Sequence, residues 1–507
     1  MRSLRTVIVS GLRLGSGQII VQGCSFFRSV IVARLISVDD YGVAAAFAMT
    51  LTLLEMISNL SFDKLLVQAS DGNAEAFQKT AQLVQVTRGI TNGLILFALA
   101  GLIARLFGIP QAVWGFRCLA LLPVMRGFLH LDANRMQREM RFGPAVRIDV
   151  VSNVLVTLVA WPLAAWLRNY YAMLVLLLMQ VAAAIVVSHL VAERRYGWAW
   201  ERRYAHRMFS FGWPLLINGL LLYGIMHGDR VIIGSAKQLF PHAIYTLKNL
   251  GEYSIAFSVM MAPAVFVGNV TTSLFLPVLS RARAFPLDFQ RSYHRIFALI
   301  CLIAGLITIP CIVAGPKLLV WIYGPKYSAA GGLVGIFAAM WGLRIIRYVP
   351  SVAALSSGDT RSPMVSNLVR SLTFVVSIYA AAAGQPLVWI AVAGLLGDFL
   401  ALPTLMWQVS HRHGADSRPC LMPLAVIGAG ASISFLLAHF SQTDALASVV
   451  FLKTLSTTGI TAGLLIALTP PLRADLQSAT LAVSNFFRTE LISSRARPEH
   501  ITASNPE

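Results

Sequence analysis

Arginines inside long apolar stretches are the residues of this sequence whose type and position best suit chemistry. A guanidinium keeps its charge and donates paired N–H bonds in a planar fork that matches carboxylate or phosphate. An arginine facing lipid near mid-membrane costs at least ~2.5–3.5 kcal/mol on insertion scales, so we expect such residues to face a cavity or a partner. The candidates for binding an anionic substrate are Arg28, Arg34, Arg88, Arg117 and Arg230.

Structural explanations compete at several of these positions. Arg34 lies near the end of its apolar stretch, where a long side chain can also reach the headgroup region. Arg28 and Arg88 lie deeper, and for them a cavity lining and a purely structural pairing are equally open. Arg230 directly follows Asp229, so a local ion pair with a structural role is the main alternative for that dipeptide.

Acidic residues in the apolar stretches suggest coupling to an ion gradient. Glu55 and Asp398 fall in mid-stretch, and with Asp229 they are the candidates for carrying a coupling proton or sodium ion. Charge balance for a buried arginine is an equally good explanation. No metal site or bound cofactor is predicted, because the five cysteines form no C-x-x-C pair and no histidine cluster accompanies them.

Enzyme chemistry finds little support in the sequence. No Walker A, H-E-x-x-H or G-x-S-x-G pattern occurs. The longest candidate outward loop, 236–249, lacks a convergent set of acid and base groups. We therefore predict that the protein is not an enzyme.

Composition shows which elements must position these residues. The chain of 507 residues is 57% hydrophobic and only 12% charged, whereas a soluble domain carries about 25% charged residues. Lipid is therefore the expected solvent, and about fourteen apolar stretches are long enough to span it as helices. They are 14–36, 42–67, 81–106, 111–133, 147–167, 170–191, 211–235, 248–279, 294–315, 327–349, 363–383, 386–408, 421–440 and 445–469.

The basic residues behind the net charge of +19 lie in short loops between these stretches rather than in one basic domain. That distribution is the positive-inside pattern, and it predicts a multi-pass protein of a bacterial inner membrane with both termini in the cytoplasm. Nucleic acid is accordingly excluded as a partner. The most basic segment, 192–210, holds five arginines. Contact with anionic lipid is its simpler explanation, and docking of a cytoplasmic enzyme is the alternative.

A weak internal repeat predicts two lobes. LRLGSG (12–17) and VARLIS (32–37) frame the first stretch much as FSFGWP (209–214) and GDRVIIGS (228–235) frame the seventh. The expected organisation is an N-terminal lobe, a basic cytoplasmic linker, a C-terminal lobe, two extra spans and a cytoplasmic tail. These parts comprise 1–191, 192–210, 211–408, 409–469 and 470–507, respectively.

Several ordered motifs carry a family resemblance. They are VARLISVDDYGVAAAF (32–47), LDANRMQREMRF (131–142), FSFGWPLLINGLLLYGIMHGDRVIIGS (209–235), LGEYSIAF (250–257) and LFLPVLSRAR (274–283). Together they resemble the polysaccharide transporter (Wzx-like) family of the multidrug/oligosaccharidyl-lipid/polysaccharide flippase superfamily. Val38, where that family usually has proline, and the extended 236–249 stretch depart from its pattern.

The resemblance implies an all-α fold of two pseudo-symmetric six-helix lobes around a central cavity, with two further C-terminal helices. It also implies movement of undecaprenyl-diphosphate-linked oligosaccharide units from the inner to the outer leaflet by alternating access. The implied partners are that lipid-linked substrate, membrane lipids, and a polysaccharide polymerase with its chain-length regulator. Alternatives are a scaffold or polymerase component of a polysaccharide synthesis complex, or an exporter of drugs or organic cations, which would favour an acidic cavity.

Overall fold

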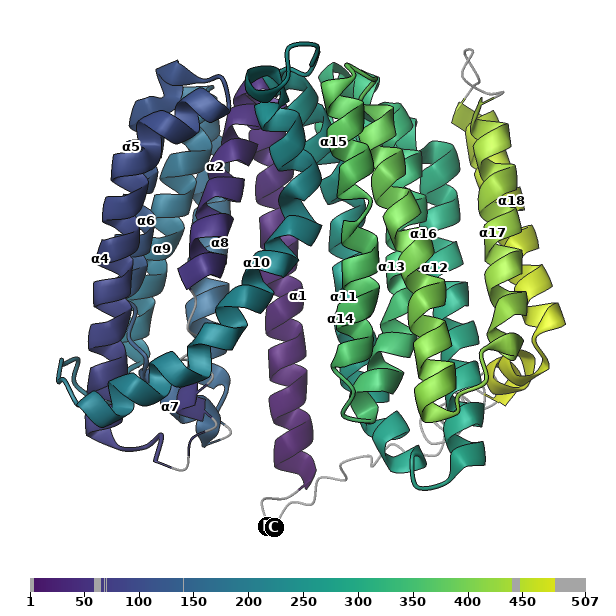
Figure 1. The fold of residues 1–507 in the computed structure, drawn as a ribbon, viewed down its shortest axis with the longest axis horizontal. Coiled ribbons are helices and arrows are strands. Elements are labelled where there is room, and N and C mark those ends of the chain that lie inside the picture. Colours follow the sequence, from purple (N-terminus) through teal and green to yellow (C-terminus); the bar gives the residue numbers. More distant parts are fainter. Residues whose placement is uncertain are drawn as a thin grey trace, which may run out of the picture. The chain divides into compact units, whose positions relative to one another are not determined.

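A computed structural model describes residues 4–58, 65–67, 69, 71–139, 141–439 and 447–478, and all the regular elements that we name in them are helices (Figure 1). The chain divides into two compact units. The first comprises Met1–Val265, Gly315–Trp341 and Val365–Ala401, and the second comprises Phe266–Ala314, Gly342–Met364 and Leu402–Glu507. The division predicted at 192–210 stays a prediction, and most of the predicted tail, from residue 479 on, lies outside the described residues.

Within the described residues, each of the fourteen predicted apolar stretches is found as one helix or as a broken helix, and residues 59–64, 440 and 445–446 of these stretches lie outside the described part of the chain. The helices of the first half are α1 (Leu4–Leu35), α2 (Val38–Ser58), α4 (Glu75–Leu106), η1 (Pro110–Ala112), α5 (Val113–Leu119), α6 (Leu121–Gly127), α7 (Asp132–Arg138), α8 (Gly143–Leu167) and α9 (Tyr171–Val191). Those of the second half are α10 (Arg202–Leu239), α11 (Leu247–Ala282), α12 (Pro286–Tyr323), η2 (Pro325–Ala330), α13 (Gly331–Ser356), α14 (Arg361–Ser371), α15 (Phe374–Ala382), α16 (Val388–His413), α17 (Arg418–His439) and α18 (Ala447–Leu468).

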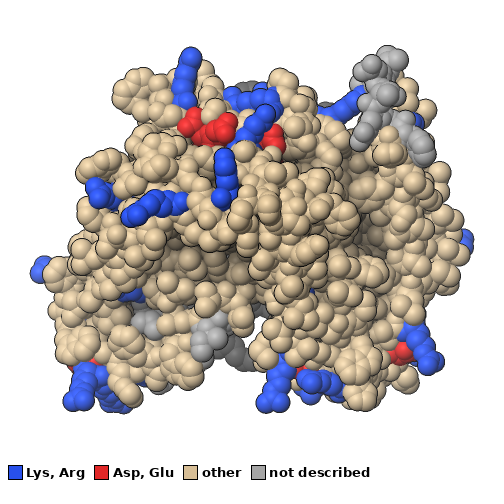
Figure 2. All heavy atoms as spheres, turned by 45° about the horizontal axis from the view of Figure 1, so that its top comes forward, with Lys and Arg blue, Asp and Glu red and all other residues tan. Residues whose placement is uncertain are grey.

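Twelve helices in the described residues are long and apolar enough to cross a membrane, or thirteen if the bent α5–α7 segment counts as one span. Helix α10, which begins at Arg202 inside the basic segment, covers the predicted stretch 211–235 but is not among them. Large apolar side chains such as Leu158, Trp166 and Trp321 are more than 70% exposed, as lipid-facing residues are. Figure 2 shows a surface that is mostly uncharged, with lysines and arginines gathered near its upper and lower margins. The predicted all-helical, multi-pass membrane fold is confirmed.

The fourth span is broken rather than continuous. Pro123 has no N–H for the carbonyl of Leu119, where α5 ends. A second bend, of 49°, separates α6 from α7. The carbonyls freed at this bend are bound by glutamines of α4: Gln85 Nε2 lies 2.9 Å from Arg126 O and 3.0 Å from Leu129 O, and Gln82 Nε2 lies 2.8 Å from Leu129 O. Side-chain amides thus replace the missing helical partners, as a broken span in lipid requires.

Within the first unit, α1 packs along α8, α8 along α9, and α4 along α5 and α6. The first turns of α10 cross the lower end of α4 in Figure 1. Helices α2 and α11 approach each other through two glycines of the family motifs. A Cβ on Gly42 would overlap the carbonyl oxygen of Leu247, and one on Gly251 would overlap that of Val38. The glycines of the DYG and LGEYS motifs therefore allow direct backbone contact.

Replacing Gly42 by alanine should lower the free energy of unfolding by about 1–3 kcal/mol, because the added methyl group forces the two backbones apart. Gly23 in α1 is the matched control, since a Cβ there meets nothing within 4 Å, and Gly23→Ala should be neutral or stabilise by up to about 1 kcal/mol. The measurement is the denaturation midpoint of each purified variant in detergent. A Gly42→Ala variant as stable as Gly23→Ala would contradict this account of the α2–α11 contact.

Candidate functional site

Arg28 is the predicted residue whose surroundings point most directly to a ligand. It is only 8% exposed, and its Nη1 lies 3.5 Å from Oδ1 of Asn153 in α8. That oxygen also accepts a bond of 3.2 Å from Gln180 of α9. No carboxylate pairs with Arg28 in the part of the chain that the structure describes. A buried cation matched only by a long bond to a neutral amide is poorly balanced.

Arg88 lines a polar hollow of about 430 Å³ between α4, α7 and α8. Its Nη1 donates to the carbonyl of Ser58 at the end of α2, 3.3 Å away. The other polar residues lining the hollow are Gln85, His130, Asn134, Gln137, Asp149 and Ser188. Arg88 therefore lines a space that is large enough for a polar ligand. Arg28 is not among the residues that line this hollow.

Arg34, predicted to bind an anionic substrate or to reach the headgroup region, contacts backbone carbonyls of another helix. Its Nε donates to the carbonyl of Ile322, 2.7 Å away, and its Nη2 to that of Trp321. These are carbonyls of the last turn of α12, which have no helical partner and carry the negative end of the helix dipole. The arginine thus caps α12.

Lys326 caps α1 in return. Its Nζ lies 3.0 Å from the carbonyl of Arg34 and also contacts that of Ile36. The hydroxyl of Tyr327 donates to the carbonyl of Ala33 over 3.2 Å. We call the contacts of Arg34, Lys326 and Tyr327 the α1–α12 latch, because Arg34 of α1 caps α12, and Lys326 and Tyr327 of η2, which follows α12, bind carbonyls at the end of α1.

Arg117 and Arg230 both lie over aromatic rings. The guanidinium carbon of Arg117 is 4.7 Å from the ring centre of Trp114 and 5.3 Å from that of Phe97, and both rings are more than half exposed. That of Arg230 is 4.4 Å from the ring centre of Phe257. Cation–π contacts stabilise both charges, and Arg117 sits on an apolar outer hollow lined by Leu94, Leu121 and Val124 rather than at the polar hollow.

The three acidic candidates each pair with an arginine. Asp229 lies 3.8 Å from Arg230 Nε and accepts a bond of 2.7 Å from the hydroxyl of Tyr253. Glu55 of α2 forms an ion pair with Arg126 of α6. Asp398 of α16 is fully buried, 3.3 Å from Arg370 Nε, and Arg370 also donates to the carbonyl of Ile225. Charge balance accounts for all three carboxylates, and any ion they carry has to compete with a guanidinium.

Two carboxylates, Asp132 and Glu193, fix the first residues of the basic segment to the neighbouring helices. Buried Asp132 accepts bonds from Arg135 Nε at 2.6 Å and from the backbone N–H groups of Glu193 at 2.8 Å and Arg194 at 3.2 Å. Arg141 and Arg135 in turn hold Glu193, at 2.5 and 3.0 Å. Their hydrogen bonds lower the pKa of the Glu193 carboxyl. Glu193 and Arg194, at the start of the basic segment, are therefore attached to α7.

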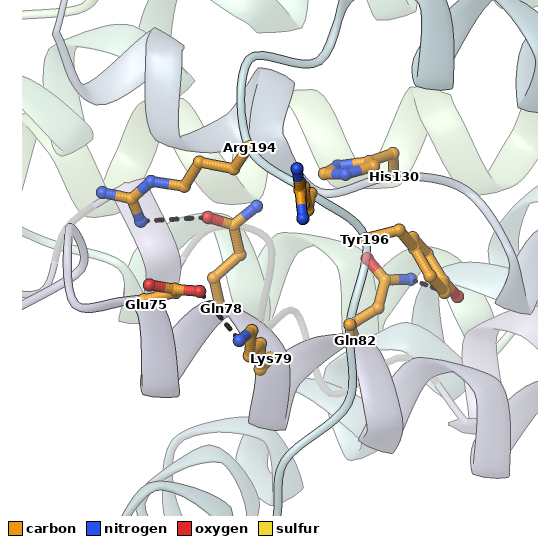
Figure 3. A pocket seen from close by; sticks show the side chains of 9 residues that line it. Glu75, Gln78, Lys79, Gln82, His130, Arg194 and Tyr196 are labelled. Carbon is orange, nitrogen blue, oxygen red and sulfur yellow. Dashed lines mark hydrogen bonds and ion pairs between the residues drawn. The ribbon is translucent and has the colours of Figure 1, made fainter.

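Figure 3 shows the small polar pocket beside this segment, with Arg194 turned toward Gln78, Lys79 toward Glu75, and Gln82 toward Tyr196. Its free space is only about 10 Å³, which is room for about one water molecule. Despite its charges, this pocket fastens the basic segment and is too small for a substrate. The sequence offered no direct signal for Asn134, Gln137 or Asn153, because uncharged amides do not stand out as arginines in apolar stretches do.

Comparison with known proteins agrees with this architecture. Residues 31–331 match the family described as polysaccharide biosynthesis protein, and the chain belongs to that family. It is 23% identical over 306 residues to the amylovoran biosynthesis protein AmsL of Erwinia amylovora, covering 59% of this chain and 76% of that protein.

Solved structures with the same fold are membrane transporters. The lipid II flippase MurJ in an inward closed conformation superposes with a TM-score of 0.65 at 13% identity, covering 91% of this chain and 98% of that one. An inward-facing multidrug resistance MATE family transporter of the MOP superfamily gives a TM-score of 0.62 at 13% identity, over 80% and 98% of the two chains. The fold is that of this transporter superfamily, and the resemblance carried by the sequence motifs is confirmed.

Proposed function

We propose that this protein moves undecaprenyl-diphosphate-linked oligosaccharide units from the inner to the outer leaflet of a bacterial inner membrane, with both termini in the cytoplasm. The observation that carries the proposal is Arg28, a buried guanidinium in a membrane-spanning helix whose described partner is a neutral amide. An intramembrane cation without a carboxylate is costly unless an anion visits it. A diphosphate is such an anion, and its oxygens accept the paired N–H bonds that arginine offers.

The acidic residues support the same substrate charge. An exporter of organic cations needs carboxylates that face its cavity, but Glu55, Asp229 and Asp398 are each paired with an arginine. Breaking the buried Arg370–Asp398 pair would cost about 3–5 kcal/mol. The pairing therefore makes these three carboxylates poor binding groups for a cationic substrate.

The α1–α12 latch gives the alternating-access step a physical basis. With the N-terminus of α1 in the cytoplasm, the latch closes the outer end of the first unit, where α2 and α11 also touch through Gly42 and Gly251. Release of substrate outward requires these contacts to separate. Each cap consists of charge–dipole contacts worth about 0.3–1 kcal/mol, which is small enough to break and reform in a transport cycle.

Export should depend on Arg28. In a strain that lacks the protein, Arg28→Ala should restore less than about a tenth of wild-type exported polysaccharide, because losing charge-assisted bonds of about 1.5–3 kcal/mol weakens binding at least tenfold. Arg28→Lys should restore part of the export. Exposed Arg105, which bonds only to its own helix through Gly101, supplies the control Arg105→Ala. Wild-type export by Arg28→Ala, at equal amounts of protein in the membrane, would contradict the proposal.

Removing the latch should favour the outward-open state. Spin labels at Asp39→Cys and Ser328→Cys, in a background without the native cysteines, report the separation of α2 and η2 by double electron–electron resonance. The double substitution Arg34→Ala/Lys326→Ala should raise the population with the longer distance by about three- to thirtyfold, since two caps are lost. Identical distance distributions with and without the latch would show that these contacts do not hold the outer end closed.

A further inference from the structure

The polar hollow beside Arg88 contains side chains whose hydrogen-bonding groups the described residues leave unused. Asn134 and Gln137 of α7 and Asp149 of α8 line it, and their side chains make no hydrogen bond or ion pair within the described part of the chain. Asn134 and Gln137 are partly buried and Asp149 is exposed, so their polar groups are accessible to a ligand that enters the hollow.

Two nearby glutamines of α4, Gln82 and Gln85, differ from these residues because their side chains are hydrogen-bonded to the protein. Gln85 also lines the hollow, but its Nε2 is committed to the carbonyls of Arg126, Gly127 and Leu129 at 2.9–3.1 Å. Gln82 in the preceding turn of α4 is bound in the same way. Gln82 and Gln85 of α4 thus hold the broken span together, whereas Asn134, Gln137 and Asp149 make no such bond within the described residues.

The charges of the hollow indicate the kind of ligand. One cation, Arg88, and one carboxylate, Asp149, lie on different helices around it. A diphosphate filling the whole space would be repelled by Asp149, so an anion fits only on the Arg88 side. The rest of the wall offers amides, which both donate and accept, and a carboxylate, which accepts twice. A sugar ring presents hydroxyls that donate and accept in the same way, and it is uncharged.

We propose that this hollow is a glycan subsite, in which Asn134, Gln137 and Asp149 bind hydroxyls of the sugars nearest the diphosphate while Arg88 contacts the adjacent phosphate. The subsite rests on the proposed function and adds a specificity element to it. Two of the three sugar-binding residues, Asn134 and Gln137, belong to α7, the short helix after the bend, so the broken fourth span places them beside the hollow. The same bend explains why two glutamines of α4 bind the carbonyls of Arg126 and Leu129.

The test compares two lipids with the full-length protein in nanodiscs. One is the undecaprenyl-diphosphate oligosaccharide, and the other is undecaprenyl diphosphate without sugar. Wild type should bind the glycan-bearing lipid more tightly. Asn134→Ala, Gln137→Ala and Asp149→Asn should each reduce that preference about three- to tenfold, the loss of one hydrogen bond or two, and leave the sugar-free lipid unaffected. Gln111→Ala, an exposed amide in η1, is the control, and thermal denaturation verifies that each variant is folded.

The outcomes separate the two proposals. Equal binding of both lipids by wild type, or an unchanged preference in the three variants, would overturn the glycan subsite and leave the flippase proposal standing. Binding of neither lipid above undecaprenol, by folded wild-type protein, would overturn the flippase proposal and the subsite together. Loss of both lipids in Arg88→Ala with an intact sugar preference in Gln111→Ala would support both.

Discussion

A guanidinium group inside a bilayer needs a partner that stabilises its charge. The partners of the arginines in this protein link its helices to one another. Carboxylates match Arg370 across α14 and α16 and Arg126 across α2 and α6. Helix-end carbonyls match Arg34, and aromatic rings match Arg117. Each of these solutions fixes one helix to another or to the lipid boundary. In our proposal Arg28, whose described partner is an amide, is a cation that the substrate diphosphate binds.

Ion coupling is constrained by the same matching. Protonation of Asp398 would weaken its ion pair with the buried guanidinium of Arg370, so a proton on that carboxylate has to compete with Arg370. A coupling ion that binds there would therefore change the contact between α14 and α16. In the proposed mechanism, binding of the coupling ion, a proton or a sodium ion, and movement of α14 relative to α16 therefore occur together.

The apolar stretches predicted the helices well, because a backbone in lipid has to satisfy its own hydrogen bonds and length alone then defines a span. The break in the fourth span was harder to see. Its signals are Pro123 and two glutamines of α4, Gln82 and Gln85, which lie 47 and 41 residues from the carbonyls of Leu129 and Arg126 that they bind. These residues can be recognised as the signals of a break only when α4 and α6 are known to be adjacent. The roles of the arginines were predictable only as a set. Arg34 and its acceptor Ile322 are 288 residues apart, so nothing local in the sequence distinguishes a helix cap from a substrate contact.

The most direct test of the central claim is transbilayer movement of the substrate itself. Purified wild-type protein would be reconstituted in liposomes that contain a fluorescent undecaprenyl-diphosphate oligosaccharide, and exposure of the lipid in each leaflet would be followed with and without proton and sodium gradients. Our account predicts protein-dependent movement faster than in empty liposomes. Movement no faster than in empty liposomes under either gradient, with folded protein present, would contradict it.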